Sequence, residues 1–184
     1  MRKVIIFMMT SLDGYFESSG HELDWHNVDH EFNEFAAKQL DEADILLFGR
    51  VTYEMMSSFW VTEQAKIIDP IVADKMNNLR KIVFSKTLID ACWNNTELIK
   101  ENIDKKIKEL KNMPGKSLFI LGSSNLAVNL IKYGLIDEFR IMVNPVVLGN
   151  GSSLFNNLQS NLKLKLINTR SFNSGNVLLY YIPG

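Results

Sequence analysis

One stretch in the second half of the chain constrains the fold more than any other. It begins with four apolar residues, 118–121, and continues through Gly122-Ser123-Ser124. Leu126, Leu130 and Ile131 then recur at helical spacing. A continuous apolar run of this length is typical of a strand that is buried on both faces, as in parallel sheets. The stretch therefore predicts a buried strand, a tight turn and a helix.

The turn in this stretch has the features of an anion site. Ser124 or Ser123 can cap the following helix, and the remaining free N–H groups of its first turn are open to an anion. The helix dipole adds to the attraction. Neither a GxGxxG fingerprint nor a Walker lysine is present. Taken alone, the stretch is explained by an ordinary strand–turn–helix unit, so the case for a nucleotide depends on the rest of the chain.

Composition narrows the class of protein. We expect residues 1–184 to form one domain. The net charge of −1, without long runs of one sign, gives no support for binding to nucleic acid or to a membrane surface. Cys92 is the only cysteine, so no intrachain disulfide can form, and a reducing cytoplasmic compartment is expected. The basic start and short apolar run predict a first strand rather than a signal peptide, and no apolar run approaches membrane-spanning length.

The first two thirds of the chain alternate between apolar runs and helical patterns. The expected strands are 4–9, 45–48, 81–84, 96–99 and 118–121. The expected helices are 28–42, 51–59, one that Asp69-Pro70 begins, one that Asn102 caps, and one after Ser124. The polar segment 15–27 is predicted to be a loop over a site.

The last third of the chain reads as β structure. Residues 139–148 form a long β run, in which Pro145 suggests an edge position or a bulge. A glycine turn follows at 149–151, then an alternating strand at 162–167. Residues 173–176 predict a hairpin turn before a strand at 177–182. The chain is therefore expected to form an α/β sheet that is parallel in its body and antiparallel at its C-terminal end.

Small or polar residues follow three of the predicted parallel strands. These segments are Gly49-Arg50-Val51-Thr52, Ser85-Lys86-Thr87 and Gly122-Ser123-Ser124. In open α/β sheets, ligands bind at this carboxyl edge. Two of the segments place a cation beside a hydroxyl group, as a phosphate requires. Arg50 or Lys86 alone is explained as a solvated charge, but the three segments together favour a nucleotide site.

Several motifs resemble one enzyme family. GRVTYE, at residues 49–54, resembles the GR-x-T-W/Y-E signature of the dihydrofolate reductase superfamily. The order SLDG, GRVTYE, IVFSK, FILGSS and LIDEFRIMVNPVVLGNG more closely resembles the reductase domain of the bifunctional riboflavin-biosynthesis deaminase-reductase and its stand-alone relatives. The resemblance runs from Val4 to Tyr181. It implies a dihydrofolate-reductase-like α/β/α fold with a mixed, mainly parallel sheet of about eight strands, and an enzyme that uses NADPH as a hydride donor.

The resemblance also implies roles for single residues. In the signature that begins at Gly49, Arg50 would lie near the adenosine 2′-phosphate and Thr52 would donate to the diphosphate. Ser85 and Lys86 would flank the 2′-phosphate from the next strand end. Gly122, Ser123 and Ser124 would approach the diphosphate. Trp25 resembles a tryptophan on the cofactor side of the riboflavin reductases, and the glycine turn at 149–151 would be structural.

The chain departs from the family pattern where the substrate would bind. Riboflavin reductases place a glutamate just before the 122–124 turn to hold the pyrimidine, and this chain has Leu121. They also hold the ribose phosphate with arginines of the first helix, where this chain offers only Lys38. Many relatives have two glycines where Gly122-Ser123 stands. The zinc motif of the deaminase is absent as well, so the chain is not the complete bifunctional enzyme.

Carboxylates and histidines of the N-terminal third are the candidates for a proton donor and a metal site. Asp13 follows the first strand and is the candidate donor of the proton that a reduction requires. A role as a turn former beside Gly14 explains this residue at least as well. Glu31 and Glu34 lie on the first helix, without a motif that fixes their register. His21, His26 and His30 cluster in sequence, but the spacing and the lack of a second shell favour no metal.

These observations predict a cytoplasmic NADPH-dependent reductase of a small heterocycle, either a pteridine or a pyrimidine. The alternative is a non-catalytic nucleotide-binding sensor or interaction module. We also expect a homodimer through residues 139–182, because apolar strands there would otherwise leave an exposed sheet edge.

Overall fold

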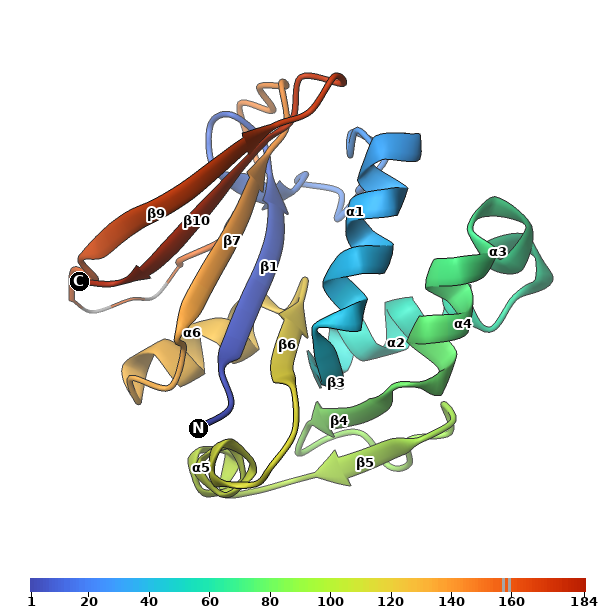
Figure 1. Ribbon diagram of the computed structural model, residues 1–184, viewed down its shortest axis with the longest axis vertical. Coiled ribbons are helices and arrows are strands. Elements are labelled where there is room, and N and C mark those ends of the chain that lie inside the picture. The colour runs from blue at the N-terminus through green and yellow to red at the C-terminus, as the bar shows by residue number, and fades with distance from the viewer. Residues whose placement is uncertain (157, 159) are drawn as a thin grey trace.

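The computed structural model describes residues 1–156, 158 and 160–184 and confirms the predicted α/β fold (Figure 1). Within these residues the strands are β1 Val4–Thr10, β2 Tyr15–Glu17, β3 Ala43–Gly49, β4 Arg80–Phe84, β5 Thr96–Ile99, β6 Ser117–Leu121, β7 Glu138–Val143, β8 Ser152–Ser153, β9 Leu164–Ser171 and β10 Val177–Pro183. The helices are α1 His30–Asp41, α2 Arg50–Trp60, α3 Glu63–Ile68, α4 Pro70–Asn78, α5 Ile103–Asn112 and α6 Ser124–Lys132. None of these helices is long and apolar enough to cross a membrane.

Eight strands form one sheet in the order β5-β4-β3-β6-β1-β7-β10-β9. The first six in this order pair in parallel, and β10 and β9 then add antiparallel pairs. This confirms the prediction of a parallel body with antiparallel C-terminal strands. The first strand lies in the interior, where Val4 pairs with Leu118 of β6 and Ile5 pairs with Glu138 of β7. Short strands β2 and β8 pair separately.

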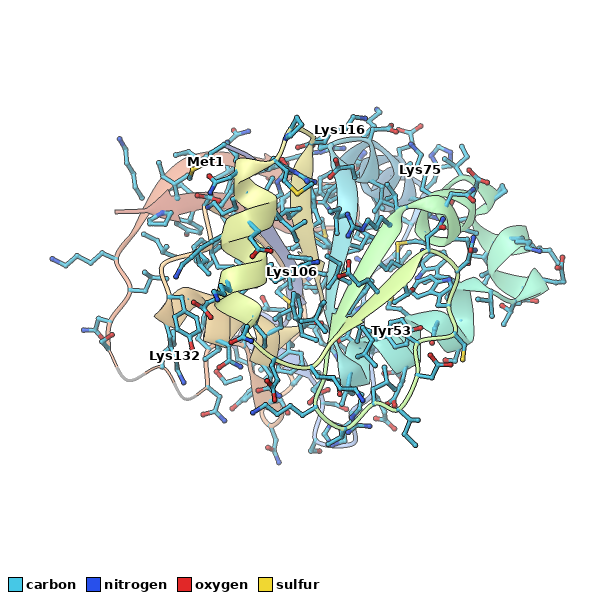
Figure 2. All side chains as sticks on the ribbon, turned by 90° about the horizontal axis from the view of Figure 1, so that it is seen from below. Met1, Tyr53, Lys75, Lys106, Lys116 and Lys132 are labelled. Carbon is cyan, nitrogen blue, oxygen red and sulfur yellow. The ribbon has the colours of Figure 1, made fainter. Side chains whose placement is uncertain are left out.

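Buried side chains of the central strands alternate between the two faces of the sheet and form two cores. On one face Ile6 and Ile120 pack with Ile107 of α5 and Leu130 of α6. On the other face the core joins strand residues to side chains of α1, α2 and α4. The strand residues include Ile5, Leu46 and Phe119, and the helix residues include Phe35, Tyr53 and Met76. Figure 1 shows the sheet between these two groups of helices. Figure 2 shows α5 from below, with Lys106 on the helix and Lys116 just before β6. This three-layer arrangement explains why the central strands are apolar on both faces.

Capping side chains begin several helices, and the predicted start of a helix at Asp69-Pro70 is confirmed. The Asp69 carboxylate accepts from Val72 N at 2.9 Å, and Pro70 occupies the first position of α4. Asp29 caps α1 by accepting from Phe32 N at 2.8 Å. The six-residue helix α3 was not predicted, because it is too short to show a periodic apolar face; Thr62 caps it.

Two local predictions were wrong. Asn102 precedes α5 but has a left-handed backbone with φ of 55°, and its side chain makes no capping hydrogen bond. The β run 139–148 is shorter than expected, because β7 ends at Val143. Pro145 therefore lies beyond the strand rather than at a bulge, and β7 is an interior strand between β1 and β10.

Candidate functional site

The three predicted ligand segments follow strands that are neighbours in the sheet. β3 lies between β4 and β6, and all three run in the same direction. The segments that begin at Gly49, Ser85 and Gly122 therefore leave the same edge of the sheet. This adjacency confirms the geometric part of the sequence analysis, whereas the roles of the individual residues stay predictions.

Two hydrogen bonds join the segment after β3 to the segment after β6. Gly49 N donates to Ser123 Oγ at 3.0 Å. Thr52 Oγ1 donates to the carbonyl oxygen of Gly122 at 3.2 Å. Ser123 and Thr52 are both buried. These bonds fix the starts of α2 and α6 relative to each other, although the two segments are far apart in the sequence.

The starts of α2 and α6 carry no side-chain cap. Gly49 precedes α2 and has no side chain, while Ser123 precedes α6 but makes no capping bond. The expectation that Ser123 or Ser124 caps the helix was therefore wrong: Ser123 Oγ accepts from Gly49 N instead, and Ser124 is already the first residue of α6. The first backbone N–H groups of a helix have no partner within the helix, so both starts are suited to an anion.

Gly122 makes a close turn possible between these helices. Its φ is +66°, a conformation that L residues adopt rarely. A Cβ atom at this position would lie 3.4 Å from Cγ2 of Thr52. A glycine at the position of Ser123 would lose the hydrogen bond from Gly49 N.

A shallow groove of about 480 Å³ lies beside the start of α2. It is lined by residues of α2 and of the loop after β4, namely Arg50, Glu54, Thr87, Leu88, Ile89 and Asp90. Ser85 shapes the loop, because its Oγ accepts from Thr87 N at 3.1 Å and from Leu88 N at 2.9 Å. Lys86 is exposed in the same loop. Arg50 therefore lines this groove and Ser85 lies in the loop beside it, and their roles toward a cofactor stay predictions; the carboxylates of the groove were not anticipated from the sequence.

Trp25 belongs to a loop at another part of the same sheet edge. Its Nε1 donates to the Glu22 carbonyl oxygen at 3.1 Å, and its ring meets His26 edge to face at 4.4 Å. In the described residues, no hydrogen bond or ring contact joins Trp25 to the segments after β3, β4 and β6. The structure therefore does not bring Trp25 into contact with the other predicted cofactor residues.

Three asparagines fix the end of this loop. Asn144 Oδ1, at the end of β7, accepts from Asn27 N at 2.9 Å, and Asn176 Nδ2 donates to Asn27 O at 2.8 Å. Asn27 Nδ2 donates in turn to Ser174 O at 2.7 Å. Asn144 and Asn176 are fully buried. The sequence analysis missed this clamp, and the only available signal was the apolar surroundings of Asn144 and Asn176.

His26 lies next to the clamp and is half-buried, with its Nε2 atom shielded from solvent. Burial lowers the pKa of His26 to about 4, so the imidazole is neutral at physiological pH. Among the described residues, His26 Nε2, Ser174 Oγ and Asn176 Oδ1 are buried without a hydrogen-bond partner. The other two histidines face carboxylates, since His21 lies 2.9 Å from Glu17 and His30 lies 3.8 Å from Glu34.

The candidate acids are held by donors from distant loops. Asp13 accepts from Leu148 N at 3.1 Å and from Gly149 N at 2.7 Å. A hydrogen bond from Ser11, followed by these backbone donors, lowers the pKa of Asp13. The carboxylate therefore connects the loop after β1 to the glycine turn and is ionised at neutral pH. This geometry gives Asp13 a structural role beside any catalytic one.

Glu31 and Arg170 form a pair at the start of α1 that the sequence analysis missed. Arg170 Nη2 lies 3.0 Å from Glu31 Oε1, and Asn173 N donates to the other Glu31 oxygen at 2.9 Å. These contacts, with the Asn173 backbone bond first, lower the pKa of Glu31. The Arg170 guanidinium stacks 4.3 Å from the Phe172 ring. A cation thus reaches the first helix from β9 rather than from the helix itself.

Comparison with known proteins adds a family to this geometry. The family model described as the RibD C-terminal domain matches residues 2–178. The uncharacterized protein YyaP of Bacillus subtilis is 32% identical, covering 98% of this chain and 94% of YyaP. The uncharacterized protein YwjB of the same organism is 28% identical and covers 98% of each chain.

Solved structures share the fold over the whole chain. A protein of Shewanella sp. PV-4 named for riboflavin biosynthesis has 26% identity and a TM-score of 0.77, covering 99% of each chain. A diaminohydroxyphosphoribosylaminopyrimidine deaminase/5-amino-6-(5-phosphoribosylamino)uracil reductase of Thermotoga maritima has a TM-score of 0.72 at 15% identity. This chain corresponds to 57% of the Thermotoga protein, and at that identity the likeness concerns the fold alone.

Proposed function

Because this chain belongs to the RibD C-terminal domain family, we propose that it is an NADPH-dependent reductase that transfers a hydride to a small flat heterocycle of the pyrimidine or pteridine type. One observation carries the proposal. Two helices without side-chain caps, α2 and α6, begin at neighbouring strand ends and are joined by the Gly49–Ser123 and Thr52–Gly122 hydrogen bonds. Two converging sets of free N–H groups match the charge of a dinucleotide diphosphate.

The residues present fit such a cofactor. We assign the diphosphate to the first backbone N–H groups of α2, including that of Thr52, and to the turn at residues 122–124. The Thr52 hydroxyl already donates to Gly122 O, so its contribution to an anion comes from the backbone. Arg50, Ser85 and Lys86 are assigned to the adenosine 2′-phosphate. When bound, the cofactor supplies the hydride.

We assign the flat ring of the substrate to the apolar carboxyl ends of β1 and β6. Leu121 at the end of β6 pairs in register with Phe7 of β1. The Phe7 ring lies 5.7 Å from Phe35 and 6.4 Å from Phe32, both on α1. Asp13 is our candidate for the proton step. Its lowered pKa keeps the carboxylate ionised, so we assign it the orientation of a water molecule rather than direct donation.

The test separates an enzyme from a nucleotide-binding module without turnover. NADPH oxidation is followed by absorbance against a panel of pteridines and pyrimidines, while calorimetry measures the Kd of NADPH and NADH. Turnover of at least one heterocycle supports the reductase. Tight NADPH binding with no turnover across the panel supports the sensor, and no binding of either nucleotide contradicts the assigned site.

Calorimetry also tests the choice of cofactor. A charge-assisted hydrogen bond contributes roughly 1.5–3 kcal/mol, so contacts to the 2′-phosphate predict a preference for NADPH of about tenfold or more. Equal Kd values for NADPH and NADH would contradict the assignment of Arg50, Ser85 and Lys86.

A further inference from the structure

One buried hydrogen bond joins the two walls of the groove beside α2. The first wall is the start of α2, which carries Arg50, and the second is the loop between β4 and β5, residues 85–95. Tyr53 Oη, on α2, accepts from Trp93 N at 2.9 Å, and Figure 2 labels Tyr53. In the part of the chain that the structure describes, no other hydrogen bond joins α2 to this loop. The Tyr53 hydroxyl is therefore the polar link between the walls.

Trp93 is fixed at the end of this loop by its side chain as well as its backbone. It is 4% exposed, and its Nε1 donates to Asn77 Oδ1 at 2.8 Å. The Nζ atom of buried Lys81 lies 4.6 Å from the centroid of the Trp93 ring. Ser85 shapes the opposite end of the loop through the two hydrogen bonds that its Oγ accepts. The segment that carries Lys86 is thus held between two anchors.

Core packing alone does not explain the hydroxyl of Tyr53. The rings of Tyr53 and Trp93 belong to one apolar cluster and lie 6.1 Å apart, and a phenylalanine ring would fill the same space. A hydroxyl buried in such a cluster lowers stability unless it is hydrogen-bonded. Here its partner is the backbone of the loop that lines the groove. Because Tyr53 is about one helical turn from Arg50, the bond fixes the loop relative to Arg50.

We propose that Tyr53 is a positioning residue for the adenosine end of the cofactor and acts through Trp93 N, which it holds against α2. This inference rests on the proposed function, which assigns the 2′-phosphate to Arg50, Ser85 and Lys86. These three residues come from both walls of the groove, so a phosphate can contact all of them only at one spacing of the walls. Without the hydroxyl of Tyr53 the loop is less ordered, and nucleotide binding must then order it at a cost in affinity.

The test measures by calorimetry the Kd of NADPH and of adenosine 2′,5′-bisphosphate, which is the adenosine end alone. Wild type and Tyr53→Phe are compared at a temperature where both are folded. Tyr53→Phe is expected to raise both Kd values by the same factor, about threefold to tenfold, because the change acts at the adenosine end. A purely structural role would lower the Tm and leave both Kd values unchanged. Tyr133→Phe is the matched control, because it removes the hydroxyl of a tyrosine that is 56% exposed at the C-terminal end of α6.

Hydrogen exchange of the wild type gives a second test, which decides the matter if Tyr53→Phe does not fold. A ligand that binds more tightly when the bond is formed must also favour the bond. Saturating adenosine 2′,5′-bisphosphate should therefore slow exchange of the Trp93 amide more than exchange of the Phe172 amide, which donates to Asn176 O at 2.9 Å before β10.

Each outcome decides between the claims. Unchanged Kd values in Tyr53→Phe, a rise for NADPH alone, or equal slowing at the two amides overturns the inference, while nucleotide binding by the wild type keeps the proposed function. An equal loss of affinity in Tyr133→Phe is a general effect of losing a hydroxyl and also overturns the inference. A wild type that binds neither nucleotide overturns the proposed function and this inference with it.

Discussion

His26 is a half-buried titratable side chain, and the partial burial of its ring predicts a pH dependence. Its pKa is about 4 in the fold and about 6.5 in an unfolded chain. As pH falls from 6.5 towards 4, the unfolded chain takes up a proton that the fold does not, so stability is lost as pH falls. We expect the wild type to lose about 2 kcal/mol of its free energy of unfolding in this way between pH 7 and pH 4.5. His26→Phe should not show this loss, so urea unfolding should find it more stable relative to the wild type at pH 4.5 than at pH 7 by that amount.

The control for this prediction is His30→Phe. The side chain of His30 is 90% exposed. Its removal should therefore have little effect on the difference in the free energy of unfolding between pH 7 and pH 4.5. If the free energies of unfolding of the wild type and His26→Phe changed equally across this range, His26 would be protonated in the fold at the lower pH.

Leu121 carries the prediction about the substrate. The sequence resemblance implies that it stands where riboflavin reductases have a pyrimidine-holding glutamate, and it is 8% exposed in an apolar cluster. The first helix supplies no arginine for a ribose phosphate. Two lost charged contacts of roughly 1.5–3 kcal/mol each correspond to a loss of about two to four orders of magnitude in kcat/KM, if they add.

The measurement is steady-state NADPH oxidation with the phosphoribosylaminouracil for which the Thermotoga maritima enzyme is named, with that enzyme assayed in parallel. We expect a kcat/KM well below 10⁴ M⁻¹s⁻¹, roughly the lower limit of an efficient enzyme. A value above this limit would show that Arg170, which reaches α1 from β9, or another residue replaces the missing contacts.

Single residues also show where sequence reasoning stops. The apolar run and the turn at 122–124 were predictable because their pattern is local. The role of Ser123 was not, because its partner Gly49 N comes from another strand end. Lys81 was read as part of a strand; it is fully buried because its Nζ donates to three carbonyl oxygens, of Met76, Asn77 and Leu79, at the end of α4.

At the scale of elements, the asparagine clamp connects strand ends to the loop that carries Trp25. Asn144 Nδ2 also donates to Thr10 O at 3.2 Å, so one buried side chain links β1, β7 and the loop. We expect Asn144→Ala to lose about 1–3 kcal/mol of stability, since Asn27 N loses its acceptor. Hydrogen exchange at the Asn27 amide should become faster, which mass spectrometry of peptides from residues 18–29 would detect.

Asn129→Ala is the matched control for the clamp. Asn129 is exposed on α6, where its Nδ2 donates to Asn125 O at 2.9 Å. This change should leave exchange in residues 18–29 as in the wild type. Equal protection of the Asn27 amide in Asn144→Ala would show that the remaining bonds to Ser174 and Asn176 suffice to hold the loop.

The existence and type of most elements were predictable, whereas their ends were less so. The strands of the parallel body are buried on both faces and therefore form unbroken apolar runs. Position in the sheet was harder to predict: Pro145 suggested an edge, but the strand simply ends before it. The order of the strands depends on long-range pairing, which local sequence patterns do not give.

At the scale of the whole molecule, β9 leaves an apolar sheet edge in contact with solvent. It is the last strand of the sheet, and Leu166 and Ile167 on it are 49% and 48% exposed. An exposed edge strand with apolar side chains is a site of pairing. We therefore expect a homodimer through β9, with a mass by light scattering of about twice 21.1 kDa at micromolar concentration.

A substitution tests which surface forms the dimer. Ile167→Lys should shift the mass towards the monomer, because it places a charge in the interface. Ile67→Lys changes an equally apolar side chain that is 74% exposed on α3 and should leave the mass unchanged. A monomeric wild type would refute the dimer. A dimer that persists in Ile167→Lys would show that another surface forms the interface.

The interior position of β1 has a consequence for synthesis on the ribosome. β1 leaves the exit tunnel well before its two neighbours in the sheet, because β6 and β7 belong to the second half of the chain. At about 5–20 residues per second, the apolar strand waits on the order of ten seconds before its partners are made. Nascent chains that stop before β7 should therefore recruit chaperones or aggregate, and the carboxyl edge that α2 and α6 share can form only after translation has passed α6.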